Sequence, residues 1–466
     1  MNRRALLTGS MSLLGTAALA SLLPLGRERA LAMPHFTPRV RRVVYLFMSG
    51  GPSQLETFDH KPGLAALDGT ELPESIRRGQ RLTTMTSGQS SFPVVAPRVG
   101  FTQHGENGTW VSDLLPHLGS IVDRLCIVRS MHTDAINHDP AVTLIQSGSM
   151  NPGRPCMGSW VSYGLGAPTR DLPTFAVLLS NSGLFGGQPL STRFWSSAFL
   201  PAHHQGVQLR GGSDPVLYLD DGTGAPQASR ERLRDARTAL DQMHADETGD
   251  PDVTARIEAY ELAFRMQTSV PTLARAGDEP ESTYTLYGDD ARIPGTFAAN
   301  CVLARRLLED DVRFVQLYHR DWDHHGTMQT DHPIAARAVD RASTALVLDL
   351  ERRGLLEDTL VIWGGEFGRT VYGQGEVRTD QYGRDHHPRC FSMWLAGGGV
   401  RGGLVHGTTD DYSYNVVDGA LHVHDFQATV LHLLGFDHTR LTYRSEGRDF
   451  RLTDVSGRVA NELLDE

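Results

Sequence analysis

The sequence predicts an α/β fold in which a mostly parallel sheet is covered by helices on both faces. Two segments with helical spacing, 296–308 and 335–353, each lead into an apolar segment of strand character, beginning at Val312 and Leu360. Repeated helix-then-strand order is typical of parallel sheets. Residues 42–48 are apolar at every position after Arg42, which indicates a central strand buried on both faces.

The remaining elements follow in chain order. Further strands are predicted at 125–128, 174–179 and 391–395, and helices at 110–123, 140–148 and 425–435. The last helix starts at Asp425, a residue type that caps amino ends, and closes at Gly435.

Between 185 and 295 this pattern is interrupted. A stretch rich in Gly, Pro and Ser, to residue 224, precedes two charged amphipathic helices at 229–245 and 252–268. We interpret 185–295 as an insertion that shapes substrate access within a single domain, 33–466.

Residues 1–32 are predicted to be a signal peptide. Arg3 and Arg4 precede an apolar segment that ends at Ala30-Leu-Ala32, a motif typical of cleavage sites. The paired arginines indicate the twin-arginine export machinery, with a general secretory signal as the alternative. We therefore expect a bacterial protein that is exported to the periplasm or beyond, without a permanent membrane anchor.

The net charge and the spacing of the cysteines argue against several classes of protein. The formal net charge is −11, and losing the leader removes four arginines and one glutamate, so the mature chain is more acidic still. This balance argues against a nucleic-acid partner. The four cysteines have no CxxC spacing, which argues against a zinc ribbon or a disulfide scaffold.

Carboxylate and imidazole groups gather after two of the predicted strands. Side chains at the carboxyl ends of parallel strands project into a shared crevice, where such donors suit a divalent transition ion. Adjacent residues rarely face one ion, so His386 and His387 are alternatives, and Asp323 would orient His325 if Asp321 is the ligand. The candidates from these strand ends are Asp321, His325, His386, His387 and Glu366.

Three motifs, at 48–62, 365–370 and 383–388, resemble those of the DUF1501 proteins, an exported family within the alkaline phosphatase and sulfatase superfamily. The resemblance covers nearly all of the mature chain. It implies an alkaline phosphatase-like core and a divalent metal, zinc or manganese, held by Asp321, His325 and either His386 or His387.

The resemblance also implies departures from the phosphatase pattern. Ser49 stands where a metal-binding aspartate is usual, and Phe367 stands where a ligand is usual, so a second metal site would have to draw on groups such as Asp59 and Glu366. His138 occupies the nucleophile position, and the turn that begins at Ser49 could bind a substrate oxygen through its backbone N–H groups.

These observations favour an exported metal-dependent hydrolase of phosphate, sulfate or related esters. In that hypothesis the substrate is an anionic ester or glycan, and His138 acts as nucleophile or proton donor. The alternative is a non-catalytic, metal-containing envelope or glycan-binding protein on the same fold.

Overall fold

The computed structural model describes the chain from Pro34 to Asp465, with gaps at 170, 185–187, 212–226, 249–256, 258–259, 267–268, 271–272, 274–278 and 379. The expected signal peptide, 1–32, lies outside the described residues. Among the described helices, none is both long enough and apolar enough to cross a bilayer.

A nine-stranded mixed sheet forms the centre of the molecule. Its main path runs in the order β12 (Val405–His406), β4 (Leu125–His132), β11 (Phe391–Ala396), β8 (Thr359–Gly364), β1 (Arg42–Met48), β7 (Phe314–His319), β5 (Phe175–Ser180) and β6 (Val207–Leu209), while β15 (Leu421–His422) pairs with β4. β11 is antiparallel to both of its neighbours, and the other pairs are parallel. The prediction of a mostly parallel sheet is confirmed.

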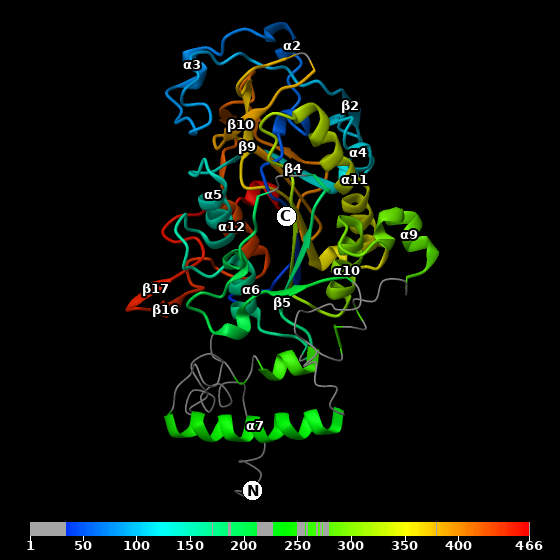
Figure 1. The fold of residues 1–466 in the computed structure, drawn as a ribbon, viewed down its shortest axis with the longest axis vertical. Coiled ribbons are helices and arrows are strands. Elements are labelled where there is room, and N and C mark those ends of the chain that lie inside the picture. Colours follow the sequence, from blue (N-terminus) through cyan, green and yellow to red (C-terminus); the bar gives the residue numbers. More distant parts are fainter. Residues whose placement is uncertain are drawn as a thin grey trace, which may run out of the picture.

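Helices cover both faces of this sheet (Figure 1). One face packs against α4 (Pro116–Ser120), α9 (Glu281–Tyr287), α10 (Phe297–Glu309) and α11 (Met328–Arg352), and the other packs against α5 (His138–Ser147), α6 (Met157–Leu165) and α12 (Val423–Leu433). In β1, Val44 and Leu46 join the first core while Val43 and Tyr45 join the second. This alternation explains why the strand is apolar at every position after Arg42.

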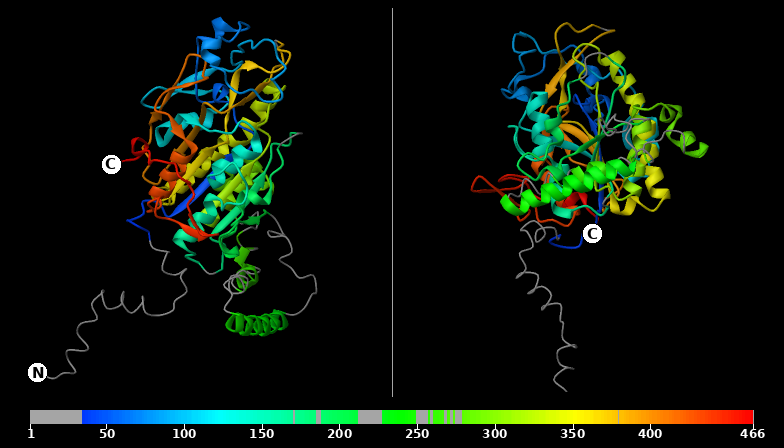
Figure 2. Two further views of the ribbon diagram at one scale, coloured as in Figure 1. Left: turned by 90° about the vertical axis from the view of Figure 1, so that its left-hand side faces the viewer. Right: turned by 60° about the horizontal axis from the view of Figure 1, so that its bottom comes forward.

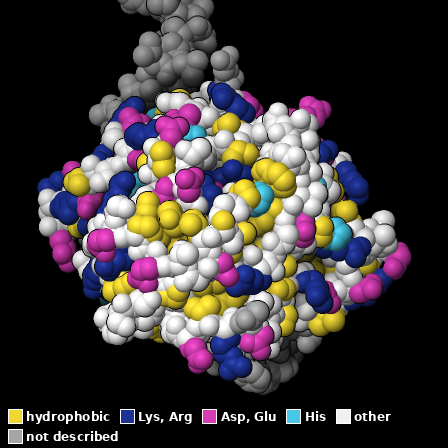
Figure 3. Space-filling view, turned by 90° about the horizontal axis from the view of Figure 1, so that it is seen from above, with side chains coloured by type: hydrophobic (Ala, Val, Ile, Leu, Met, Phe, Trp, Pro, Cys, Tyr) yellow, Lys and Arg dark blue, Asp and Glu magenta, His cyan; other side chains and the backbone are white. Residues whose placement is uncertain are grey.

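Smaller elements surround the main sheet. They include the two-stranded pairs β2 (Phe101–His104) with β3 (Thr109–Ser112), β9 (Gly368–Gly373) with β10 (Arg384–His387), β13 (Thr408–Thr409) with β14 (Val416–Asp418), and β16 (Tyr443–Ser445) with β17 (Arg448–Phe450). The helices α2 (Leu64–Leu67) and α3 (Glu74–Arg77) lie at one end of the molecule, and α7 (Gln227–Thr248) lies at the opposite end (Figures 1 and 2). Figure 3 looks onto the end that carries α2 and α3, where basic and acidic side chains are interspersed and neither sign dominates.

Several predicted elements differ from the observed ones. The helix predicted at 110–123 is wrong, because Trp110 and Val111 pair with β2, and the range contains only the five-residue α4 and the start of a 3-10 helix, Val122–Arg124. α11 begins at Met328, well before the predicted start, and accommodates Pro333 near its amino end. α12 is capped by the His422 side chain, while Asp425 completes the cap by accepting from the His422 backbone N–H.

The region 185–224 is less irregular than predicted. It contains the edge strand β6, which continues the parallel sheet beside β5, and two short 3-10 helices, Thr192–Trp195 and Ala202–His204. The second helix predicted for the insertion, 252–268, falls mostly outside the described residues.

We predict that acid destabilises the fold partly through His204. Burial, followed by the nearby His203, lowers the pKa of His204 to about 3, and its Nδ1 lies 2.9 Å from the Ser162 hydroxyl. The unfolded chain takes up a proton below the usual value near 6.5 while the folded chain does not, so stability falls as pH falls. This residue should contribute a loss of about 2 kcal/mol between pH 7 and 5. Urea unfolding across that range should show a shallower pH dependence in His204→Gln; equal slopes would contradict the assignment.

Candidate metal centre

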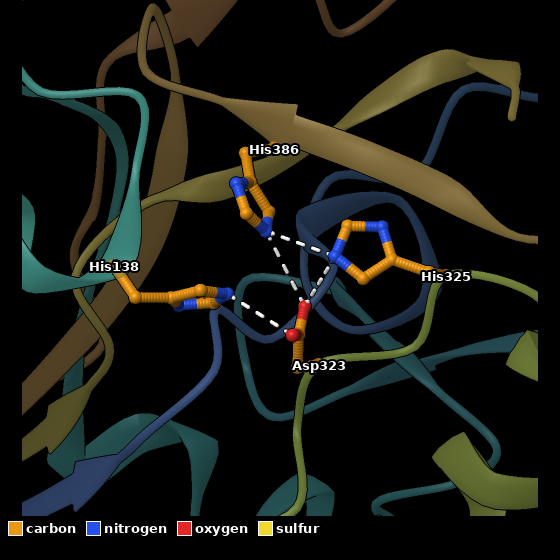
Figure 4. A group of neighbouring side chains, drawn as sticks. All are labelled: His138, Asp323, His325 and His386. Atoms are coloured by element: carbon orange, nitrogen blue, oxygen red, sulfur yellow. Dashed lines mark hydrogen bonds and ion pairs between the residues drawn. The ribbon is translucent and has the colours of Figure 1, made fainter. Parts of the chain in front are cut away.

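Four side chains from three separate segments meet beyond the carboxyl ends of the central strands. Asp323 and His325 follow β7, His386 lies in β10, and His138 is the first residue of α5. One ligand atom from each lies within 4.8 Å of the others. Figure 4 shows the three imidazoles turned toward the Asp323 carboxylate.

Asp323 is the centre of this cluster. Its Oδ1 lies 2.7 Å from Nε2 of His325 and 3.3 Å from Nε2 of His386, and its Oδ2 lies 3.1 Å from Nε2 of His138. The Nε2 atoms of His325 and His386 are 3.0 Å apart. Every ring therefore presents its Nε2 to the same small volume.

The opposite nitrogen of each ring faces an oxygen outside the cluster. Nδ1 of His138 is 2.7 Å from Glu366 Oε1, and Nδ1 of His386 is 2.9 Å from the Ile136 carbonyl oxygen. Nδ1 of His325 is 2.5 Å from the amide oxygen of Gln374. These acceptors favour the tautomer with hydrogen on Nδ1, which leaves each Nε2 lone pair directed into the cluster.

This arrangement favours a proton or a cation at its centre. In this tautomer the lone pairs of His325 and His386 oppose one another, and the lone pair of His138 opposes a carboxylate oxygen. Each contact is repulsive unless a proton or a metal ion lies between the atoms. Burial lowers the pKa of His386 to about 3, so this ring is neutral near pH 7 and suited to metal binding.

Arg369 fixes the position of Asp323, the central carboxylate of the cluster. It is fully buried, and its guanidinium lies 2.7 Å from Asp323 Oδ1. It also donates to backbone carbonyls of Gly50, Gly51, Trp322 and Arg384. Burial alone would raise the pKa of Asp323, but Arg369 and the three histidines hold it well below its usual range.

Glu366 orients His138 and adds a second buried carboxylate to the site. It follows β8, is completely buried and accepts from the backbone N–H of Gly50 at 3.0 Å. Burial lowers the pKa of His138, but hydrogen bonds with Asp323 and Glu366 raise it overall. With neutral imidazoles, the two carboxylates and the Arg369 guanidinium leave one formal negative charge, which a cation would offset.

The structure does not bring Asp321 or His387 into this group. Asp321 has a positive φ of 78° and accepts from the Ser182 backbone N–H at 2.9 Å. His387 follows His386 in β10, so its side chain points to the other face of the strand, where Nε2 lies 2.6 Å from the Tyr414 carbonyl oxygen. Asp323 and His386 lie in the cluster in place of Asp321 and His387.

Asp59 and Ser49 also lie outside the cluster. Asp59 accepts from the hydroxyls of Thr409 and Ser413 and lies 3.4 Å from the Lys61 ammonium. Ser49 is buried, and its backbone N–H donates to His319 at the junction of β1 and β7. Glu366 is placed beside the cluster, in contact with His138 rather than with the Asp323 carboxylate.

The sequence favoured Asp321 over Asp323 as the ligand, with Asp323 orienting His325, and it gave no indication of Gln374 or the Ile136 carbonyl. The spacing of Asp323 and His325 was a usable signal, because alternate residues of an extended segment lie on one side. Phe367, which the sequence marked as an unusual replacement, forms an apolar wall, with its ring centroid 4.9 Å from that of His138 and 4.5 Å from that of His386.

The fold and the cluster define an α/β protein with a candidate His/Asp metal centre at the carboxyl ends of its central strands. Residues 40–464 match the family described as "Protein of unknown function (DUF1501)". The chain belongs to this family, as its motifs predicted. No curated protein matches the chain in sequence.

Similar solved structures include enzymes of the alkaline phosphatase and sulfatase type. The lipoteichoic acid synthase LtaP from Listeria monocytogenes has 9% identity and a TM-score of 0.36, covering 91% of this chain and 79% of that one. The PsFucS1 sulfatase from Pseudoalteromonas sp. has 11% identity and a TM-score of 0.34, with coverages of 90% and 70%. The alkaline phosphatase of the Antarctic bacterium TAB5 has 11% identity and a TM-score of 0.28, with coverages of 78% and 92%.

We predict that Arg369→Met lowers the free energy of unfolding by about 3–5 kcal/mol, because it leaves the buried Asp323 carboxylate without its cation. Urea titration of the protein measures this loss. Arg378→Met is the matched control, since Arg378 and its partner Asp380 are 61% and 79% exposed and their pair should contribute little. An effect no larger than that of the control would contradict the role of Arg369.

Proposed function

We propose that this chain is an exported, metal-dependent hydrolase of phosphate, sulfate or related anionic esters. The observation that carries the proposal is the convergence of three Nε2 atoms on Asp323 while each Nδ1 faces an outer oxygen acceptor. That pattern, in which a second partner orients each imidazole, is typical of metal-binding histidines.

Asp323, His325 and His386 would hold one divalent ion, zinc or manganese. Imidazole and carboxylate donors suit both metals. When bound, such an ion supplies a Lewis acid for an ester oxygen and lowers the pKa of a bound water. The side chains of His325 and His138 are 18% and 12% exposed, so the edge of the centre borders solvent, while Nε2 of His138 is itself buried.

His138 and Glu366 would move a proton during hydrolysis. Glu366 fixes the His138 ring through Nδ1, which leaves Nε2 directed toward Asp323 and the proposed ion. Three protein ligands then leave a coordination position open for water or substrate, as in catalytic sites. The hydrogen bonds that raise the pKa of His138 suit a proton donor to a leaving group.

A non-catalytic metal-containing protein is the second candidate. It is favoured by the position of His138 within the same 4.8 Å group, because four protein ligands would fill a tetrahedral shell and leave no open position. In that case the protein would bind an envelope component or a glycan without turning it over.

We predict that the mature protein contains about one divalent ion per chain. Elemental analysis should find the ion lost in His325→Ala and His386→Ala but retained in His387→Gln, the matched control, because His387 points toward Tyr414. The same exported preparation should begin at Met33 if the leader is processed after Ala32. A metal-free wild type, or a His387→Gln variant that loses the ion while His386→Ala keeps it, would contradict the assignment of the metal ligands.

The two candidate functions differ in the effect of His138→Ala. For a hydrolase, turnover of aryl phosphates or sulfates should fall by about 10²-fold or more while the metal content is unchanged. Glu366→Gln, which leaves the His138 ring in place but weakens its orientation, should cause a smaller loss. A wild type without turnover, together with loss of metal in His138→Ala, would favour the four-ligand structural site.

A further inference from the structure

A separate cavity of about 360 Å³ lies beside the loop that leads into the metal centre. Its walls come from the end of β4, the segment after β10, the turn after α3 and the segment around β14. The lining residues are Arg78, His132, Thr133, Arg389, Asn415, Val416 and Ala420. The lining thus contains two guanidinium groups and no carboxylate.

Among the described residues, no carboxylate offsets the positive charges of the two arginines of this cavity. Arg389 donates to the carbonyl oxygens of Arg77 and Arg78 and to the side-chain oxygen of Asn415, all of which are neutral acceptors. Arg78 donates through Nε to the Ser75 carbonyl oxygen. Within the described part of the chain, no carboxylate forms a salt bridge with either residue. Arg389 is therefore held in place without being neutralised.

Hydrogen-bond donors complete the lining. Thr133 is 6% exposed, and its hydroxyl has no hydrogen-bond partner among the described residues. Nδ1 of His132 is likewise buried without such a partner. The side-chain amide of Asn415 has no free donor, because its Nδ2 already donates to the Ile76 carbonyl oxygen and to Asp410. The Thr133 hydroxyl is therefore free to donate to a ligand that enters the cavity.

We propose that this cavity binds a tetrahedral oxyanion, a sulfate or phosphate group. Guanidinium and hydroxyl donors match the oxygens of such a group. The volume lies within the range of ligand pockets, so it can also accept part of the unit that carries the anion.

The cavity adjoins the proposed active site through two short chain segments. Thr133 begins the loop that ends at His138, and Arg389 lies three residues after His386. The Thr133 backbone N–H donates to the Pro388 carbonyl oxygen at 2.9 Å, which joins the two segments. If the chain is the hydrolase proposed above, the cavity is a subsite for a second anionic group, and the substrate carries more than one sulfate or phosphate.

The test is calorimetric titration of inorganic sulfate and of inorganic phosphate into the full mature protein. Thr133→Val and Arg78→Gln should each weaken binding of one or both anions by about tenfold, the effect of losing one charge-assisted or buried hydrogen bond. Thr344→Val is the matched control, because Thr344 is also 6% exposed with an unpartnered hydroxyl but lies in α11, away from the cavity. Binding that is equal in all three variants, or absent in the wild type, would overturn the proposal.

The same titration in the His325→Ala background separates this proposal from the hydrolase. The cavity should still bind the anion there, because none of its lining residues belongs to the metal centre. If the wild type is active, Thr133→Val should raise KM for a doubly sulfated or doubly phosphorylated substrate while leaving kcat, and KM for a monoester, unchanged. Anion binding that disappears with His325 would show that the anion occupies the metal centre instead.

Discussion

The buried ion pair between Arg369 and Asp323 is the interaction on which the rest of the site depends. Asp323 could not remain ionised at this depth without a cation beside it, and Arg369 supplies one at 2.7 Å. The same guanidinium donates to the turn after β1 and to the segment after β7. One side chain therefore joins the ends of two parallel strands and holds the carboxylate that the histidines surround.

Around this pair, each imidazole is oriented from outside the cluster. His138 is held by Glu366, His325 by Gln374 and His386 by the Ile136 carbonyl. The partners are of different kinds, but each favours hydrogen on Nδ1 and leaves Nε2 for the centre. This shared orientation places the three Nε2 atoms where a single proposed ion could contact all of them.

Local sequence patterns predicted most of the main strands and helices but only some of the residues of the candidate metal centre. The strands at 42–48 and 360–363 and the helix at 296–308 were predictable because local hydrophobic periodicity reflects burial on a sheet or helix face. The helix predicted at 110–123 was wrong, because pairing with β2 overrides a helical pattern at Trp110. Asp323 had been given only a supporting role, because a ligand-rich segment does not itself show which carboxylate faces inward.

By itself, the sequence determined the family, the mostly parallel α/β architecture and two of the three segments that supply imidazoles, since these follow from local patterns of residue type. Tertiary structure decided which member of each segment enters the cluster. In β10, strand alternation turns His386 inward and His387 toward Tyr414, and after β7 the positive φ of Asp321 directs its carboxylate to Ser182. Tertiary structure also placed Arg369 and Glu366, because pairing between residues more than 40 positions apart depends on strand order, which no local pattern encodes.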